Sequence, residues 1–308
     1  MATQLQSRSA AVARAPRLAA LSLVTFPEPI DIGASLALFR RSGDDCLDRW
    51  DGTHLVRVLR FGSRRMPFIA QPEGNALRVE LTDPTVLGAI AQTFFLAPSG
   101  FAELLGQDAV LATLHARFPA VRQPRQLDLF TALVRCISAQ QVNLRWAVTT
   151  RRRLAESFGV RHEVEGQVIY SLEPEVLIEV SPQQIRELQF TMSKSHAIIA
   201  VAQAMARGEV SLEVLADLPD NEVIARLSAI KGIGRWSAEW ILARTMGRPV
   251  VVAGDLGVRK AVGLAYLGTP LPSEQEVRAV TAHWGESAGV AQALLLHALG
   301  EGALRLGV

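Results

Sequence analysis

The chain contains 308 residues, of which 49% are apolar and 20% are charged, and its formal net charge is +2. This length is enough for two domains with separate cores, and no apolar run reaches the roughly 18 residues that a membrane-spanning helix needs. The composition therefore predicts a soluble globular protein without a membrane partner. A charge close to zero excludes a uniformly basic surface but allows a local basic patch that could bind nucleic acid.

The two cysteines, Cys46 and Cys136, lie far apart, and neither has a second cysteine at Cys-x-x-Cys spacing. This pattern excludes a zinc ribbon and a disulfide framework. We therefore expect a reduced, cytoplasmic setting and no bound metal.

Residues 1–18 contain Arg8, Arg14 and Arg17 together with Ser and Ala residues, and they contain no acidic residue. Organellar transit peptides have such a composition, and so do disordered basic tails. We favour a disordered basic tail, because the apolar segment that follows extends only from Leu18 to Val24.

Residues 19–100 alternate apolar with polar side chains in short segments that turns separate, which is typical of an antiparallel sheet. The expected strands are 21–26, 54–61, 67–71 and 76–81, and the expected helices are 33–41 and 84–95. No catalytic pattern is found among these residues.

After residue 100 the strand pattern ends, and apolar residues recur at helical spacing to the end of the chain. Loops marked by Pro or Gly separate the expected helices, which are 101–117, 127–139, 142–158, 182–188, 193–205, 212–218, two helices on either side of residues 231–234, 256–267, 273–283 and 289–299. The sequence therefore predicts an α+β protein, in which a small antiparallel-sheet domain (19–100) precedes an all-α domain (101–308).

The segment from Leu227 to Trp240 is the strongest motif of the second domain. Apolar residues repeat at helical spacing on both sides of Lys231-Gly232-Ile233-Gly234, so two helices meet at a four-residue turn. The two glycines allow positive φ angles and the close approach of another backbone. Because the second helix begins with unpaired N–H groups, the turn can bind an anion such as a nucleic-acid phosphate.

This hairpin, followed about twenty residues later by Gly254-Asp255 ahead of a new helix, resembles the helix-hairpin-helix DNA glycosylase superfamily. The segment from Phe130 to Asn143 is similar to a second block of that superfamily. The pattern is nearest to the alkylation-repair branch, 3-methyladenine DNA glycosylase II, over about residues 120–300, whereas residues 20–100 resemble it only in general shape.

The resemblance implies a sheet domain similar to the TATA-binding protein, followed by a helical domain of two lobes with a base pocket in the cleft between them. The absence of a four-cysteine iron–sulfur cluster sets the chain apart from the endonuclease III and adenine-mismatch branches.

Asp255 precedes an apolar helix, so its simplest role is to cap that helix. The resemblance implies that it is also the catalytic acid. Cleavage of an N-glycosidic bond builds positive charge on the deoxyribose, and an oriented carboxylate stabilises that charge and positions or activates the attacking water. The two roles are compatible, because a helix N-terminus stabilises an anion.

Trp236 stands where bifunctional members of the superfamily carry a lysine that forms a Schiff base, which an indole cannot form. The resemblance therefore implies a monofunctional enzyme in which Trp236, Trp284 and Phe130 line the pocket for a flipped, cationic base. Inward packing of Trp236 beside Trp240 is the alternative. Of a Trp-Arg-Ser-like stretch in these relatives only Trp284 is retained, so base preference stays open.

The resemblance also implies DNA contacts at the hairpin and at a loop that enters the minor groove and fills the gap left by the flipped nucleotide. The hairpin residues are Lys231, Gly232, Ile233, Gly234 and Ser237, and the loop residues are Gln140 and Gln141, followed by Arg145. Arg145 and the run Arg151, Arg152 and Arg153 follow on one helix, and they form either a solvated basic face or phosphate contacts. Glu239 is expected to be solvated or to cap a helix.

We therefore expect a monomeric, monofunctional DNA glycosylase that excises alkylated or otherwise damaged purines from duplex DNA and needs no cofactor. A monovalent cation at the hairpin turn stays open, as does the identity of the damaged base. The alternative is a non-catalytic helix-hairpin-helix DNA-binding protein. Asp255 favours the enzyme, because binding alone does not need a carboxylate close to DNA.

Overall fold

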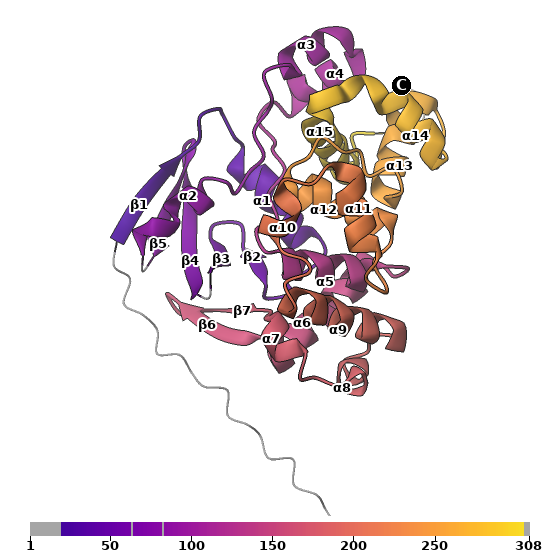
Figure 1. The fold of residues 1–308 in the computed structure, drawn as a ribbon. Helices are drawn as coiled ribbons and strands as arrows, with labels where there is room; N and C mark the ends of the chain where they lie inside the picture. Colours follow the sequence, from indigo (N-terminus) through magenta and orange to yellow (C-terminus); the bar gives the residue numbers. More distant parts are fainter. Residues whose placement is uncertain (1–19, 63, 82, 305–308) are drawn as a thin grey trace, which may run out of the picture.

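The structure is a computed structural model that describes residues 20–62, 64–81 and 83–304. The predicted basic tail, residues 1–18, lies outside these ranges. Figure 1 shows the sheet on one side of the molecule and most of the helices on the other. No helix in the described ranges is long and apolar enough to cross a membrane.

A five-stranded antiparallel sheet forms the N-terminal part, with the spatial order β1-β5-β4-β3-β2. Its strands are β1 (Ala20–Thr25), β2 (Asp48–Trp50), β3 (Leu55–Phe61), β4 (Arg64–Glu73) and β5 (Ala76–Leu81). The four predicted strands are confirmed. Strand β2 was not predicted, because three residues are too few to show an alternating pattern.

One face of this sheet packs against α1 (Ile32–Arg41), the 3-10 turn η1 (Pro84–Val86) and α2 (Leu87–Ile90). Asp31 begins α1 by accepting a hydrogen bond from the N–H of Ala34 at 2.9 Å. Leu36, Phe68 and Leu77 are among the fully buried side chains of this core. The second predicted helix is shorter than expected, since it ends at Ile90 rather than residue 95.

The remainder of the chain is mainly helical, and its helices lie close to the predicted positions, except for a short helix at residues 174–177 that was not predicted. They are α3 (Phe101–Gln107), α4 (Ala109–Arg117), α5 (Leu129–Ala139), α6 (Leu144–Phe158), α7 (Pro174–Leu177), α8 (Pro182–Glu187), α9 (Met192–Ala206), α10 (Leu212–Ala216), α11 (Asp220–Ser228), α12 (Arg235–Ile241), α13 (Leu256–Val262), α14 (Glu274–Thr281) and α15 (Ala288–Gly300). The π-helical turns η2 (Leu242–Met246) and η3 (Gly263–Leu267) extend α12 and α13, and the 3-10 segment η4 (Ala282–Ser287) precedes α15.

The predicted helix 101–117 is divided into α3 and α4. Asp108 leaves the helical conformation and caps α4, where its Oδ1 accepts a hydrogen bond from the N–H of Leu111 at 2.9 Å.

Two separate cores divide the helical part into two lobes, as predicted. The first core contains Phe130, Leu133, Ile198 and Leu227 and lies among α5, α9, α11 and α12. The second lies among α3, α4, α13 and α15.

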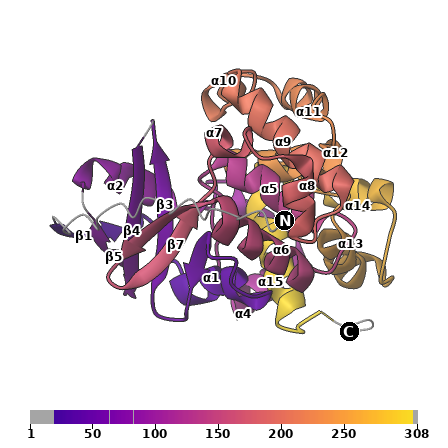
Figure 2. The same cartoon turned by 90° about the horizontal axis from the view of Figure 1, so that it is seen from below.

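The helical part also contains a β-hairpin, which the all-α prediction missed. Strands β6 (Val160–Val164) and β7 (Gln167–Ser171) pair antiparallel between α6 and α7. Val164 and Ile169 pack against Val56 and Ile69 of the N-terminal sheet. Figure 2 shows the hairpin lying across this sheet, so the two parts of the chain share a core.

Candidate active site

The turn between α11 and α12 depends on glycine at one position. Gly232 has a φ of +94°, and a Cβ atom there would lie 2.3 Å from the Cβ of Ala197 on α9. Gly234 instead has a φ of −103°, and no heavy atom lies within 4 Å of the Cβ that it lacks. The expectation of positive φ is therefore confirmed only at Gly232, and the space beside Gly234 is open.

The other hairpin residues that were predicted to bind DNA differ in exposure. Lys231 is exposed, whereas the side chain of Ile233 packs in the first lobe's core. Ser237 is 1% exposed, and its hydroxyl has no hydrogen-bond partner among the described residues. The structure does not support a contact between this hydroxyl and DNA, because Ser237 lies on the inward face of α12.

Asp255 lies at the N-terminus of α13, where it is the cap residue. Its Oδ1 accepts a hydrogen bond from the N–H of Val258 at 3.0 Å, and its Oδ2 accepts one from Nε1 of Trp236 at 3.3 Å. Asp255 is half-buried, and a Cβ at Gly257 would lie 3.0 Å from Oδ1. The carboxylate is thus held by the backbone of one lobe and by a side chain from the hairpin of the other.

Two further ionisable groups respond to the charge of Asp255. Burial lowers the pKa of the Arg244 guanidinium, while the Asp255 carboxylate raises it. Burial raises the pKa of the Cys136 thiol, and Asp255 raises it further, so this thiol stays protonated and is not a nucleophile. Arg244 was not predicted to lie near this site, because nothing in its local sequence connects it with a residue on another helix.

Glu239 on α12 links the two lobes beside this site. Its side chain is 2% exposed, which corrects the expectation that it would be solvated or would cap a helix. It accepts hydrogen bonds from Nε of Arg235 at 2.8 Å and from a terminal nitrogen of Arg278 on α14 at 2.8 and 3.0 Å. The two arginines compensate the burial of the carboxylate, and Arg278 connects α14 to α12.

The three predicted pocket aromatics are not equivalent. Trp236 is half-buried, and its indole nitrogen reaches Asp255. Phe130 and Trp284 are 0% and 2% exposed and lie in the cores of the first and second lobes. Both rings therefore point into the cores, and their part in lining a base pocket stays a prediction.

The predicted minor-groove loop is the turn between α5 and α6. The side chain of Gln140 donates a hydrogen bond from Nε2 to the carbonyl oxygen of Gly232 at 3.0 Å, so this amide contacts the hairpin. Gln141 is exposed and has a φ of +55°. Arg145, in the first turn of α6, is exposed as well.

The arginine run on α6 is not a uniform surface. Arg151 is buried and bonds to Asp45, Arg152 pairs with Glu156 on the surface, and Arg153 lies 5.6 Å from the ring centroid of Trp146. The alternatives of a solvated face and phosphate contacts therefore do not apply to Arg151, which has a structural partner.

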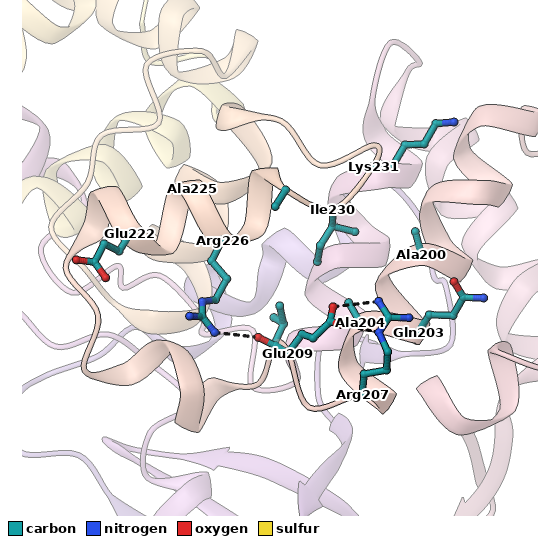
Figure 3. Close-up of a pocket in the computed structure, with 12 residues that line it drawn as sticks. Ala200, Gln203, Ala204, Arg207, Glu209, Glu222, Ala225, Arg226, Ile230 and Lys231 are labelled. Atoms are coloured by element: carbon teal, nitrogen blue, oxygen red, sulfur yellow. Dashed lines mark hydrogen bonds and ion pairs between the residues drawn. The ribbon is translucent and has the colours of Figure 1, made fainter.

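A groove of about 600 Å³ lies elsewhere, between the C-terminal end of α9 and α11. Figure 3 shows Lys231 at one end of it and Glu222 at the other, with Arg226 and Arg207 both directed toward Glu209. Trp236 and Asp255 do not line this groove, so we do not assign the chemistry to it. Among the side chains that the structure describes, no cluster of three or more His, Cys, Asp or Glu residues could hold a metal ion.

Comparisons with known proteins agree with this geometry. A family described as "HhH-GPD superfamily base excision DNA repair protein" matches residues 134–286. A Bacillus subtilis protein named "DNA-3-methyladenine glycosylase" is 25% identical over an alignment of 281 residues, which covers 86% of this chain and 92% of that protein.

Solved structures share the fold. The "3-methyladenine dna-glycosylase from Archaeoglobus fulgidus" superimposes with a TM-score of 0.80 at 23% identity, covering 90% of this chain and 98% of its own. A Clostridium acetobutylicum 8-oxoguanine glycosylase/lyase in complex with double-stranded DNA superimposes with a TM-score of 0.72 at 17% identity, covering 93% and 99%. The matched segment contains the hairpin, Trp236 and Asp255, and this chain belongs to the HhH-GPD superfamily of base excision DNA repair proteins.

Proposed function

We propose that this protein is a monofunctional DNA glycosylase that flips alkylated or otherwise damaged purines out of duplex DNA and hydrolyses their N-glycosidic bonds. The observation that carries the proposal is the placement of Asp255. Its carboxylate lies at a helix N-terminus and is bonded to Trp236 of the hairpin helix. The names of the relatives, such as the DNA-3-methyladenine glycosylase of Bacillus subtilis, support alkylated purines as substrates.

In the proposed reaction, Asp255 acts on the sugar rather than on the base. The leaving base draws electrons from C1′, and the carboxylate stabilises the positive charge that develops there. Its two oxygens have different partners, so the carboxylate cannot rotate freely. Water then adds to C1′, and Asp255 positions it or accepts its proton.

Trp236 is the residue through which we propose that the damaged base is recognised. An alkylated purine carries positive charge, which a flat indole ring attracts through its π face. Trp236 is half-buried between the hairpin and Asp255, where a flipped nucleotide would place its base and sugar together. Because an indole cannot form a Schiff base, this residue also supports simple hydrolysis without strand cleavage.

The open side of the hairpin supports the proposed DNA contact. The absence of a Cβ at Gly234 leaves room for a phosphate beside the first turn of α12. Lys231 and Arg145 are exposed and cationic, and Gln141 extends from the neighbouring turn. We propose that these groups bind the duplex around the flipped nucleotide.

The substitution Asp255→Asn tests the catalytic role. If the charge stabilises the transition state, single-turnover excision should fall by about two to four orders of magnitude, which corresponds to roughly 3–5 kcal/mol. Stability should fall by about 1 kcal/mol or less, because asparagine is also a good cap. Asp31→Asn is the matched control, since Asp31 caps α1 in the same way but lies in the N-terminal part.

The alternative function is DNA binding without catalysis. It predicts that the protein binds a lesion-containing duplex and releases no base, and that Asp255→Asn changes nothing except stability. Excision by Asp255→Asn within about tenfold of the parent rate would also contradict the catalytic role, because so small a change corresponds to only about 1.4 kcal/mol.

We further propose that the protein acts as a cytoplasmic monomer, associated with the nucleoid through DNA. Cys46 and Cys136 are both unpaired and buried, in keeping with a reducing compartment. Hydrolysis consumes only water, so we expect excision in the presence of a chelator and without a cofactor. A monovalent cation at the hairpin turn stays a prediction, which replacing potassium by a large organic cation would test. Sedimentation of the protein with and without DNA would test the monomeric state.

A further inference from the structure

The turn between α5 and α6, residues 140–143, has a conformation that its own sequence does not favour. Gln141 has a φ of +55°, in the left-handed region that residues other than glycine rarely adopt. Such a conformation persists only where the surrounding structure holds it in place. The groups that fix this turn therefore decide how Gln141 is presented to a duplex.

Three hydrogen bonds hold Ser138 and Gln140, which lie immediately before Gln141. Gln140 donates from Nε2 to the carbonyl oxygen of Gly232 at 3.0 Å. Lys194 donates from Nζ to the carbonyl oxygen of Ser138 at 2.9 Å. Arg151 donates from a terminal nitrogen to the Ser138 hydroxyl at 2.8 Å. Ser138 thus receives two of these three bonds.

Arg151 is held in turn by a carboxylate from the N-terminal part. Asp45, in the loop between α1 and β2, accepts hydrogen bonds from Nε of Arg151 at 2.8 Å and from Arg135 at 2.6 Å. The side chain of Asp45 is 4% exposed and that of Arg151 is 8% exposed. Although burial raises the pKa of Asp45, the two guanidinium groups lower it to about 2, so the carboxylate is charged.

Arg151 therefore donates hydrogen bonds from Nε to Asp45 and from a terminal nitrogen to the Ser138 hydroxyl. A guanidinium is planar and rigid, so fixing one edge also fixes the direction of the remaining N–H groups. Without the Asp45 charge, Arg151 would be a buried cation without its carboxylate partner, and its guanidinium would no longer be fixed in the direction of the Ser138 hydroxyl.

We propose that Asp45 is a positioning residue for base flipping: through Arg151 and Ser138, it holds the turn that carries Gln141 in the shape that enters DNA. The inference rests on the proposed function and extends it to the loop between α1 and β2, which contributes no group to the candidate active site. This loop of the N-terminal part then supports the turn that carries Gln141.

The comparison of two substrates tests this role. Flipping requires least work from the enzyme when the base is unpaired beforehand. We therefore compare single-turnover excision of the same lesion from a fully paired duplex and from a single-nucleotide bulge. For Asp45→Asn, we expect a loss of about 10- to 100-fold on the paired duplex and of less than about threefold on the bulge.

Asp48→Asn is the matched control. Asp48 belongs to the same buried ionic cluster and pairs with Arg57 and Arg135, but it does not bond to Arg151. Its substitution should lower stability and leave the ratio of the two excision rates unchanged. Ser138→Ala removes the acceptor of the Arg151 bond without removing a charge, and it should reproduce the selective loss even where Asp45→Asn does not fold.

Equal losses on both substrates in Asp45→Asn, or an unchanged ratio in Ser138→Ala, would overturn the positioning role and leave the glycosylase function intact. Absence of excision by the unsubstituted protein from both substrates would instead overturn the proposed function, and the inference would fail with it.

Discussion

Gly232→Ala should destabilise the protein strongly, because the turn leaves no room for a side chain. The φ of +94° places an alanine in a strained conformation, which costs about 1–2 kcal/mol. The new Cβ would also lie 2.3 Å from the Cβ of Ala197, which forces α9 and the hairpin apart. Overpacking of this kind typically costs about 1–3 kcal/mol.

The combined effect is therefore about 2–5 kcal/mol, a large part of the stability of an ordinary domain. In a protein of this size, each kcal/mol lowers the melting temperature by about 2–4 °C, so we expect a decrease of at least about 4 °C. Thermal melting and urea unfolding measure it. A melting temperature within about 1 °C of the parent would refute the argument.

Gly234→Ala is the matched control, because its φ is −103° and its missing Cβ faces open space. Its stability should change by no more than about 0.5 kcal/mol. Ala197→Gly tests the cause directly. Ala197→Gly removes the atom that clashes with the new Cβ. The double variant with Gly232→Ala should therefore lose less unfolding free energy than the two single variants lose together, by about 1 kcal/mol or more.

Strand cleavage at the excised site should require added alkali or heat, because Trp236 cannot form a Schiff base; borohydride trapping of a covalent protein–DNA adduct would contradict this. Binding to duplex DNA should weaken steeply as the salt concentration rises. Lys231→Gln or Arg145→Gln should each reduce the slope of log K against log salt by about one, where K is the association constant measured by titration at several salt concentrations. An unchanged slope would show that the substituted residue does not contact a phosphate. Because Asp45 has a depressed folded-state pKa, its contribution to stability is complete above its ordinary value of 3.8 and is lost as the pH falls toward about 2. Urea unfolding of the parent over this range should show a loss of about 2 kcal/mol that is absent from Asp45→Asn, and parallel curves for the two proteins would disprove it.

Local patterns predicted the hairpin and the Asp255 cap well. Two helices with a glycine turn between them leave a signal within about fifteen residues, and a cap lies next to the helix that it begins. Neither pattern contains the distance from Gly232 to Ala197. The sequence therefore could not show that position 232 requires glycine and that position 234 does not.

The features that the sequence could not predict depend on tertiary contacts. Phe130 and Trp284 lie in the segments that the family register predicts, but the register does not say which face of a helix meets the core. The Asp45–Arg151 pair joins residues more than one hundred positions apart and has no local signal. The β6–β7 hairpin, in contrast, has a local signal in the sequence. This signal is a Glu165-Gly166 turn between two alternating segments, and the two residues have φ angles of +46° and +71°.

The hairpin has a consequence for how this chain can be dissected. Val164 and Ile169 cover Val56 and Ile69, so cutting near residue 100 would expose apolar strands on both fragments. The predicted domain boundary near residue 100 therefore separates two segments of the sequence that pack against each other in the structure. Separately expressed halves should therefore be prone to aggregate, whereas the two pieces of a nicked chain should stay together and melt in one cooperative transition.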